Sequence, residues 1–412
     1  MMLDILPFLS CKLRFKGRLL QPNCQIETLD VLTTVDPPEV SASSSCFDSD
    51  SERPSISSRV SCSSRTSSKF SQWQSCPPSD GDCRSITAAS FDGGGVRGVS
   101  SAKIMSILMD DLARATGREE RVGDCFDLLA GTSTGGLIAL MLGRLRVPAN
   151  SLIQIYSELS ARLFNSKLKT LRSIFKGCKY SGSLARKLFE GIVMENAVEG
   201  ASALLNSDMA EGCDVFVTTV DVMDVTGNPL LLRTYDCHPS HTIAEAAQAT
   251  TAAPTYFPHK VLSSGNVVVD GGVRFNNPTE LLIREAHMRF GKNVKFNLLL
   301  SIGTGEKSPI IMRRCSSGLS LMSLPKMMGK LMTDSEAVHE RVHAKFEDTD
   351  MGTYLRINVP AIGDVNLDDF KSIPEMILAT ERFMNTPEML EVRRRTVEIL
   401  KSGLCRERAS LS

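Results

Sequence analysis

Short apolar runs alternate with longer segments of helical spacing through the middle of the chain. Residues 86–91 and 126–130 are short apolar runs, which predicts two buried β-strands. Between them, residues 100–115 carry apolar side chains at every third or fourth position, which predicts an amphipathic helix that Gly117 ends. A strand followed by a helix and then by another strand is typical of an α/β fold.

The same alternation continues as far as residue 302. Further strands are predicted at 215–220, 230–235, 267–269 and 296–302, and helices from Ser133 onward and at 152–164, 184–193, 243–249 and 278–290. We therefore predict an α/β fold with a mostly parallel central sheet that helices flank.

The two ends of the chain differ from this middle part. Serine dominates residues 41–75, and apolar side chains are too few there to offset the entropy of ordering the chain. We predict three regions: a disordered serine-rich tail at 1–83, an α/β core at 84–305, and a mainly helical extension at 306–412. The extension is expected to pack on the core and to contain one strand-like piece at 354–359.

Charge and cysteine content narrow the class of protein. Lysine plus arginine equals aspartate plus glutamate at 47 each, which argues against a dedicated nucleic-acid binder. The 12 cysteines are scattered without a C-x-x-C pair, as is typical of free thiols in a reducing compartment. No apolar run reaches the roughly 20 residues of a membrane span. The basic residues follow the short apolar stretch at 1–10 instead of preceding it, so we do not expect a secretory signal there. We predict a cytoplasmic protein with no metal or cofactor, and leave peripheral contact with membranes open.

The first motif with chemical content is Gly131-Thr132-Ser133-Thr134-Gly135, a G-x-S-x-G sequence. It follows a predicted strand and begins a predicted helix, which is the context of a nucleophile elbow. The start of the helix offers unpaired N–H groups to developing negative charge. Ser133 is therefore a candidate nucleophile. The alternative is a glycine-rich turn in which Ser133 only caps the helix.

The second motif runs from Asp92 through Gly93, Gly94, Gly95 and Val96 to Arg97 and Gly98. Consecutive glycines allow main-chain N–H groups to point into one concavity that binds an anion, such as the oxyanion of an acyl-transfer intermediate. Arg97 is interpreted either as a surface charge or as a residue that holds the loop or a phosphate.

The same stretch also fits the G-x-G-x-x-G fingerprint of a dinucleotide-binding fold. That fold requires an acidic residue about 20 positions further on, at the end of a second strand. Asp110, Asp111 and Glu119 lie in or just after the predicted helix, and Asp124 precedes the next strand. The dinucleotide interpretation is therefore the weaker alternative.

The third motif is an apolar strand at 267–269 that ends in Asp270, Gly271 and Gly272. By itself this sequence is most often a tight turn. An aspartate at the end of a strand is nevertheless where α/β sheets place functional groups. The following Asn276-Asn277-Pro278 is interpreted as a helix start.

In this order, the three motifs resemble the patatin-like phospholipase domain. The stretches 252–258, 276–278 and 301–305 resemble it too, so that the likeness covers residues 86 to 305. The resemblance implies a three-layer sandwich and a Ser–Asp dyad, with Ser133 as nucleophile and Asp270 as base. It also implies an oxyanion hole around Gly93, Gly94 and Gly95 with the N–H of Thr134.

Members of this family cleave acyl esters of phospholipids, galactolipids or neutral lipids without calcium. The resemblance therefore implies a lipid acyl hydrolase that acts on membrane or micellar lipid. It does not distinguish among these lipid classes, and the oligomeric state is left open. A non-catalytic lipid-binding or scaffolding protein on the same fold is the main alternative.

Two further alternatives concern the base and the membrane. None of the six histidines lies in a motif, but His259 follows an aromatic stretch and is the alternative base. Residues 319–332 contain leucines and methionines with Lys326 and Lys330 among them. They are interpreted either as an interfacial amphipathic helix or as an ordinary packed helix that Pro325 kinks.

Overall fold

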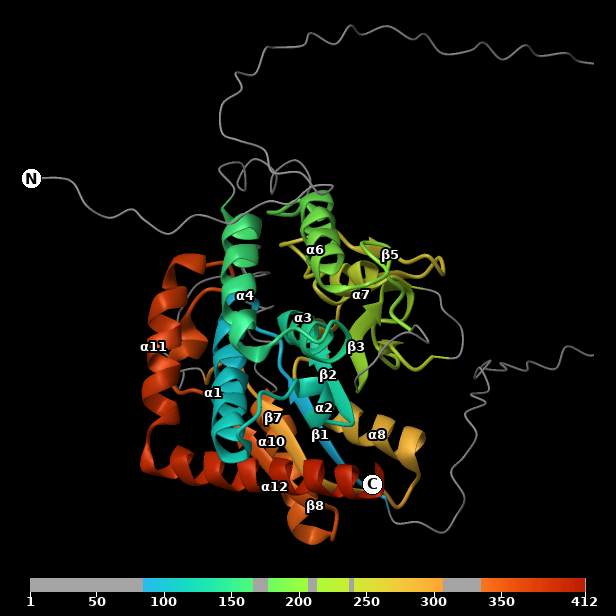
Figure 1. The fold of residues 1–412 in the computed structure, drawn as a ribbon. Coiled ribbons are helices and arrows are strands. Elements are labelled where there is room, and N and C mark those ends of the chain that lie inside the picture. The colour runs from blue at the N-terminus through green and yellow to red at the C-terminus, as the bar shows by residue number, and fades with distance from the viewer. Residues whose placement is uncertain (1–83, 166–176, 207–212, 237–240, 307–334, 412) are drawn as a thin grey trace, which may run out of the picture. The chain divides into compact units, whose positions relative to one another are not determined.

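A computed structural model shows how these segments are arranged (Figure 1). It describes residues 84–165, 177–206, 213–236, 241–306 and 335–411. Two predictions fall outside these ranges: the disordered tail at 1–83 and the interfacial helix at 319–332.

The strands form one eight-stranded sheet within the described residues, in the order β5-β6-β3-β2-β1-β7-β8, with β4 also paired to β3. The strands are β1 Ser85–Phe91, β2 Leu128–Thr132, β3 Asp214–Asp221, β4 Leu230–Arg233, β5 Lys260–Val261, β6 Val267–Asp270, β7 Lys295–Ile302 and β8 Gly352–Ile357. From β3 through β2, β1 and β7 to β8 every pairing is parallel, whereas β4, β5 and β6 join antiparallel. The predicted mostly parallel sheet is confirmed, with an antiparallel extension at one edge.

Helices cover both faces of this sheet because successive strand residues point to opposite sides. Ala89 and Leu129 pack into one hydrophobic cluster together with the helices at 98–116 and 149–164. Their neighbours Ala88 and Leu128 pack into a second cluster with the helices at 279–290 and 335–348. The α-helices are α1 Gly98–Thr116, α2 Val122–Cys125, α3 Thr134–Ala139, α4 Ala149–Phe164, α6 Gly182–Asn196, α7 Ile243–Thr250, α8 Thr279–Phe290, α10 Ser335–Asp348, α11 Ile373–Met384 and α12 Pro387–Leu411. The fold is therefore α/β, with a helical layer on each face of the sheet.

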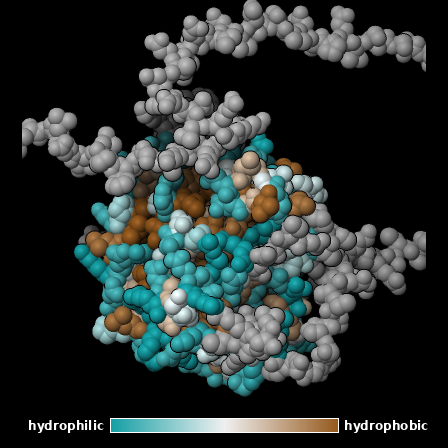
Figure 2. All heavy atoms as spheres, viewed as in Figure 1, coloured by the Kyte–Doolittle hydropathy of each residue, from teal (hydrophilic) through white to brown (hydrophobic). Residues whose placement is uncertain are grey.

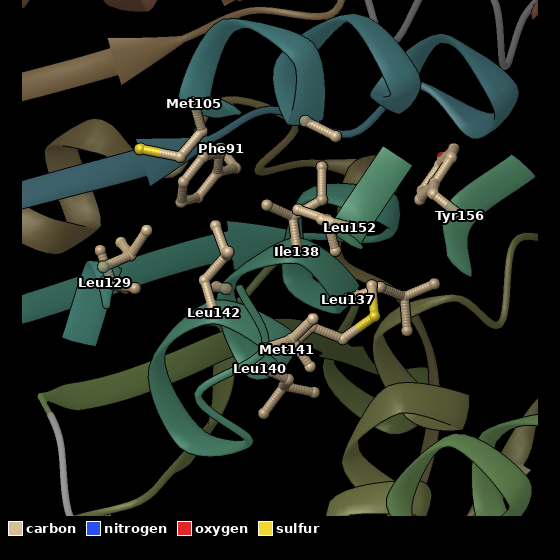
Figure 3. Packing of buried hydrophobic residues seen from close by; sticks show 14 of the residues in the cluster. Phe91, Met105, Leu129, Leu137, Ile138, Leu140, Met141, Leu142, Leu152 and Tyr156 are labelled. Carbon is tan, nitrogen blue, oxygen red and sulfur yellow. The ribbon is translucent and has the colours of Figure 1, made fainter. Parts of the chain in front are cut away.

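The first helix shows how the apolar pattern is used. α1 corresponds to the helix predicted at 100–115, and its residues Ile104, Leu108 and Leu112 are fully buried on one face. Figure 3 shows the side chain of Met105 of α1 beside Phe91 of β1, so that α1 is held against the first strand. The glycine-rich segment connects these two packed elements.

The helix that follows Ser133 begins where the sequence predicts but then changes form. α3 ends at Ala139 and continues as a π-helix, Leu140–Arg144, in which the N–H of Leu145 donates to the Leu140 carbonyl at 2.9 Å. A π-helix is wider than an α-helix, is rare, and is often found at functional sites. The sequence pattern did not predict this change.

The chain beyond residue 305 shares the central sheet. The strand-like piece predicted at 354–359 is β8, which pairs in parallel with β7. α12 contacts the C-terminal part of α1 through an ion pair between Arg393 and Asp111 at 2.7 Å. The domain boundary near residue 305 stays a prediction, although the sheet runs across it.

Every helix among the described residues is either too short or too polar to cross a lipid bilayer.

Candidate functional site

Ser133 and Asp270 meet because the strands that carry them flank the same strand, β3. Thr132 ends β2 and lies opposite Thr218 of β3, whereas Asp270 ends β6 and lies opposite the next residue of β3, Thr219. β2 is parallel to β3 and β6 is antiparallel to it, so the two motifs reach the same region from opposite directions. Their side chains are thus brought together across 137 positions of sequence.

The turn at Ser133 has an unusual backbone conformation, with φ 54° and ψ −122°. Residues with a side chain rarely adopt a positive φ, so the surrounding structure must hold it. The N–H of Ser133 donates to Thr250 Oγ1 at 2.9 Å. A Cβ atom at Gly131 would lie 2.2 Å from the Gly135 carbonyl oxygen, and one at Gly135 would lie 2.2 Å from that of Phe91. Only glycine therefore fits at both flanking positions.

The hydroxyl of Ser133 makes no capping bond to the helix that follows it. It donates instead to Asp270 Oδ2 at 2.6 Å. The other carboxylate oxygen of Asp270 accepts the N–H of Gly272 at 2.7 Å. Helix capping, the alternative interpretation of Ser133, is therefore not what the structure shows.

Burial changes the acidity of Asp270, whose exposed fraction is 3%. Desolvation raises the pKa of this carboxyl to about 7, while the hydrogen bonds from Ser133 and Gly272 act in the opposite direction. An exposed aspartate has a pKa of about 3.9 and is a weak base. A carboxylate that titrates near neutrality is better matched to accept a hydroxyl proton.

The glycine loop lies against the Ser133 turn, but its N–H groups differ in availability. Gly93 donates to the Asn276 carbonyl at 3.0 Å, and Gly94 donates to Thr134 Oγ1 at 3.1 Å. Gly95, at φ +58°, and Thr134, at the start of α3, both line the pocket that contains Ser133. The first N–H groups of a helix have no partner within it. Of the predicted oxyanion donors, Gly93 and Gly94 therefore already have partners, whereas Gly95 and Thr134 line the pocket.

Arg97 holds this loop and is not a surface charge. Its exposed fraction is 4%, its Nε donates to the Gly94 carbonyl at 3.1 Å, and its Nη1 donates to the Gly363 carbonyl. Burial lowers the pKa of the guanidinium to about 10, so it stays protonated at neutral pH.

The remaining motif glycines lie where other residues come close. A Cβ atom at Gly98 would lie 2.6 Å from the Tyr156 hydroxyl, and one at Gly271 would lie 2.1 Å from Thr218 Oγ1. Gly272 supplies the N–H that holds Asp270. These glycines allow the three motifs to pack together.

Some contacts of the motif residues, and Arg356 as a residue of the site, were not predicted from the sequence. Asn276, interpreted as part of a helix start, donates to the Gly93 carbonyl at 3.2 Å and to Ser335 Oγ at 2.9 Å. Its neighbour Asn277 is the residue whose side chain accepts the N–H of Thr279, at 3.0 Å. Asp92 accepts a hydrogen bond from Arg356, far along the chain.

His259, the alternative base, is exposed and does not line the pocket. The residues that do line it include no histidine among those that the structure describes. Within the same described ranges, no group of three or more His, Cys, Asp or Glu side chains is arranged to hold a metal ion.

An apolar pocket opens above Ser133 and Asp270. Its walls come from α3, α4, α6, the loop between α7 and β5, and the segment between β8 and α11. They are mostly aliphatic and aromatic: Leu137, Tyr156, Leu159, Leu163, Phe164, Phe189, Tyr256, Phe257 and Leu367. Figure 2 shows hydrophobic side chains gathered on the surface between α4 and α6, as those helices are placed in Figure 1. The site thus combines a hydroxyl, a buried carboxylate and main-chain donors with an apolar wall. This arrangement suits nucleophilic attack on a carbonyl that is attached to an apolar group.

Comparison with known proteins finds a family that is similar to this part of the chain. Residues 89–283, which include Ser133 and Asp270, match the model of the family described as patatin-like phospholipase.

Relatives come from several kingdoms. The chain is 31% identical over 264 residues to patatin-like protein 1 of Arabidopsis thaliana, covering 56% of this chain and 60% of the relative. It is 25% identical to patatin-like phospholipase 1 of Plasmodium falciparum, covering 75% of this chain and 49% of the relative. It is 26% identical to human calcium-independent phospholipase A2-gamma, covering 70% of this chain and 36% of the relative. The matches thus span between about a third and three fifths of the length of these relatives.

Proposed function

We propose, from the premise that residues 89–283 belong to the patatin-like phospholipase family, that this chain hydrolyses fatty acyl esters of lipids. The observation that carries the proposal is the hydrogen bond of 2.6 Å from Ser133 Oγ to Asp270 Oδ2 beneath an apolar pocket. Ser133 is the nucleophile and Asp270 is the base.

In the first half of the reaction, Ser133 Oγ attacks the ester carbonyl carbon and its proton passes to Asp270. The tetrahedral intermediate then releases the alcohol, which takes the proton from Asp270, and an acyl-serine remains. In the second half, Asp270 accepts a proton from the water that attacks the acyl-serine carbonyl. The bond to Ser133 Oγ then breaks, the serine oxygen takes the proton back from Asp270, and the fatty acid is released. One buried carboxylate thus serves both halves.

The oxyanion requires donors that are free when the substrate binds. The N–H groups of Gly95 and Thr134 fit this role, since both residues line the pocket beside Ser133. Gly94 is a third donor once the Thr134 hydroxyl turns away. Loss of one such donor costs about 2.7–4 kcal/mol of transition-state stabilisation. Gly93 stabilises the loop instead, because its N–H already donates to the main-chain carbonyl of Asn276.

We further propose that the substrate is a membrane or micellar lipid that the chain meets by peripheral contact, and that the reaction needs no calcium. The apolar wall supports a fatty acyl substrate. The human relative is named for calcium-independent activity. A buried carboxylate that titrates near neutrality supplies a base without a metal ion.

The test uses a serine-directed fluorophosphonate probe and a mixed lipid extract. The wild-type chain should be labelled and should release fatty acids that mass spectrometry detects, with EGTA present or absent. Ser133→Ala should lose both signals, and Asp270→Asn should lose nearly all fatty acid release.

Ser160→Ala is the matched control, because Ser160 lines the same pocket and is also buried. It should keep both signals. A wild-type chain that binds lipid but is neither labelled nor active would instead indicate the non-catalytic lipid-binding alternative.

A further inference from the structure

A second apolar cavity lies beyond the pocket that contains Ser133. It is lined only by apolar residues, which come from the helix that follows Ser133 and from α4, α6 and α7. Leu137, Leu159 and Phe189 line both cavities. The two cavities are therefore neighbours, and these three side chains form part of the boundary of both.

The second cavity lies further along the helix that begins at Ser133. Leu137 is one turn from Ser133, and Leu140 and Met141, which line the second cavity, follow on the next turn (Figure 3). At a rise of about 1.5 Å per residue, Leu140 lies about 10 Å along the helix axis from Ser133. The two cavities are thus arranged in series along this helix, with the reacting hydroxyl at one end.

The backbone changes form where the second cavity begins. Leu140 and Met141 are the first residues of the π-helix, and Leu145 follows its end. The wider turn shifts the side chains that follow it relative to those of α3. On the opposite wall, Phe189, Ile192 and Val193 lie on one face of α6, at the spacing that puts helical side chains side by side.

We propose that the two cavities form one channel for a single fatty acyl chain, and that Phe189 sets the longest acyl chain that the channel accepts. The proposal rests on the proposed function, because it assigns the acyl group of the same ester. The carbonyl carbon lies at Ser133, the first methylenes contact the outer pocket, and the far end of a long chain displaces the Phe189 ring to enter the second cavity. Phe189 is the largest of the three shared side chains, and α6 contributes nothing to the Ser133 turn.

The experiment compares esters of 4-nitrophenol with hexadecanoic and octanoic acid. Phe189→Ala joins the two cavities, so the ratio of kcat/KM for the long ester to that for the short ester should rise about tenfold. Ala247→Leu adds bulk to the second cavity alone, because Ala247 lines that cavity and not the outer pocket. It should lower the ratio by a similar factor.

Phe296→Ala is the control for loss of a buried ring. Phe296 is buried in the other hydrophobic cluster, on the opposite face of the sheet, and lines neither cavity. Phe296→Ala should leave the ratio of kcat/KM for the two esters unchanged. This should hold even if both variants, Phe296→Ala and Phe189→Ala, have lowered melting temperatures.

Two failures are distinguishable. If the wild-type chain cleaves both esters but the ratio stays constant in Phe189→Ala and in Ala247→Leu, the channel is wrong and the proposed function stands. If the wild-type chain cleaves neither ester nor any lipid, the proposed function fails. Binding of hexadecanoic and octanoic acids to the same proteins then decides the channel, and equal relative affinities in all of them would overturn it.

Discussion

Arg356 of β8 donates a hydrogen bond of 2.9 Å to Asp92, the residue that precedes the glycine loop, across 264 positions of sequence. Both side chains are buried, with exposed fractions of 4% and 2%. Arg356 also donates to Ser301 Oγ at 2.8 Å and to Glu336 Oε1 at 2.5 Å. Arg356, which lies on the edge strand β8, therefore holds the segment that carries the candidate oxyanion donors.

Arg356→Ala should reduce the free energy of unfolding by about 3–5 kcal/mol, because it leaves the buried Asp92 carboxylate without its charged partner. Burial already raises the pKa of Asp92 to about 6 against the opposing effect of Arg356. Urea denaturation followed by circular dichroism measures the loss. The double variant Arg356→Met with Asp92→Asn should recover part of it, since no buried charge remains.

Arg341→Ala is the matched control for this ion pair. Arg341 pairs with Glu280 at 2.9 Å where both side chains are about half exposed, at 53% and 46%. An exposed ion pair contributes about 0–1 kcal/mol, so this variant should stay close to the wild type. Equal losses in Arg341→Ala and Arg356→Ala would contradict the importance of the buried contact.

The rate of ester hydrolysis should depend on the ionisation of Asp270. The base must be ionised to accept the serine proton, and burial raises its pKa to about 7. The value of kcat/KM should therefore increase with pH through neutrality and level off above it. A pH–rate profile between pH 5 and 9 on a soluble ester checks this, and a profile that is already flat at pH 5 would exclude Asp270 as a base of this pKa.

Asp270→Asn should lose activity yet gain stability at alkaline pH. The pKa of Asp270 is raised from 3.8 to about 7 by burial, so between these pH values the folded chain keeps a proton that the unfolded chain has released. Wild-type stability should therefore fall as the pH rises from about 4 to about 7, by up to about 4 kcal/mol, and the asparagine variant should not share this fall. Melting temperatures at pH 5 and pH 8 measure the difference. A difference between the two proteins that does not widen from pH 5 to pH 8 would count against the raised pKa.

Gly135→Ala should distort the Ser133 turn, because the new Cβ would lie 2.2 Å from the Phe91 carbonyl oxygen. We expect fluorophosphonate labelling to be lost. Gly191→Ala is the control: Gly191 lies within α6 and a Cβ there meets no atom within 4 Å. This second substitution should raise stability by about 0.5–1 kcal/mol and leave labelling intact. Normal labelling of Gly135→Ala would show that the turn tolerates a side chain.

The elements that the sequence predicted correctly are those whose pattern is local. The strand at 86–91 is β1, and the helix at 100–115 is α1, because a short apolar run and a helical repeat each extend over their own residues. The π-helix at Leu140–Arg144 escaped prediction, since the apolar sequence after Ser133 fits either kind of helix. The two-residue strand β5 also escaped it, because so short a strand has no pattern of its own.

The candidate site divides in the same way. Ser133, Asp270 and the glycine loop each lie at the end of a strand, where the chain makes a sharp turn. An apolar run next to glycines therefore predicted all three from the sequence. Arg97 carried no sign of being buried, and Asn276 and Arg356 carried no sign of reaching the loop. Their roles depend on which distant main-chain groups the sheet order places beside them.

The sequence by itself determined which residues have the chemistry: a serine between glycines, an aspartate at a strand end, and a run of glycines after the first strand. Local backbone preferences and apolar spacing are sufficient for that. Only the tertiary structure decided that β3 aligns Thr132 and Asp270 on its two sides, that burial brings the aspartate pKa to about 7, and which N–H groups remain available. These properties arise from strand order and desolvation, which depend on residues more than a hundred positions apart and leave no local pattern.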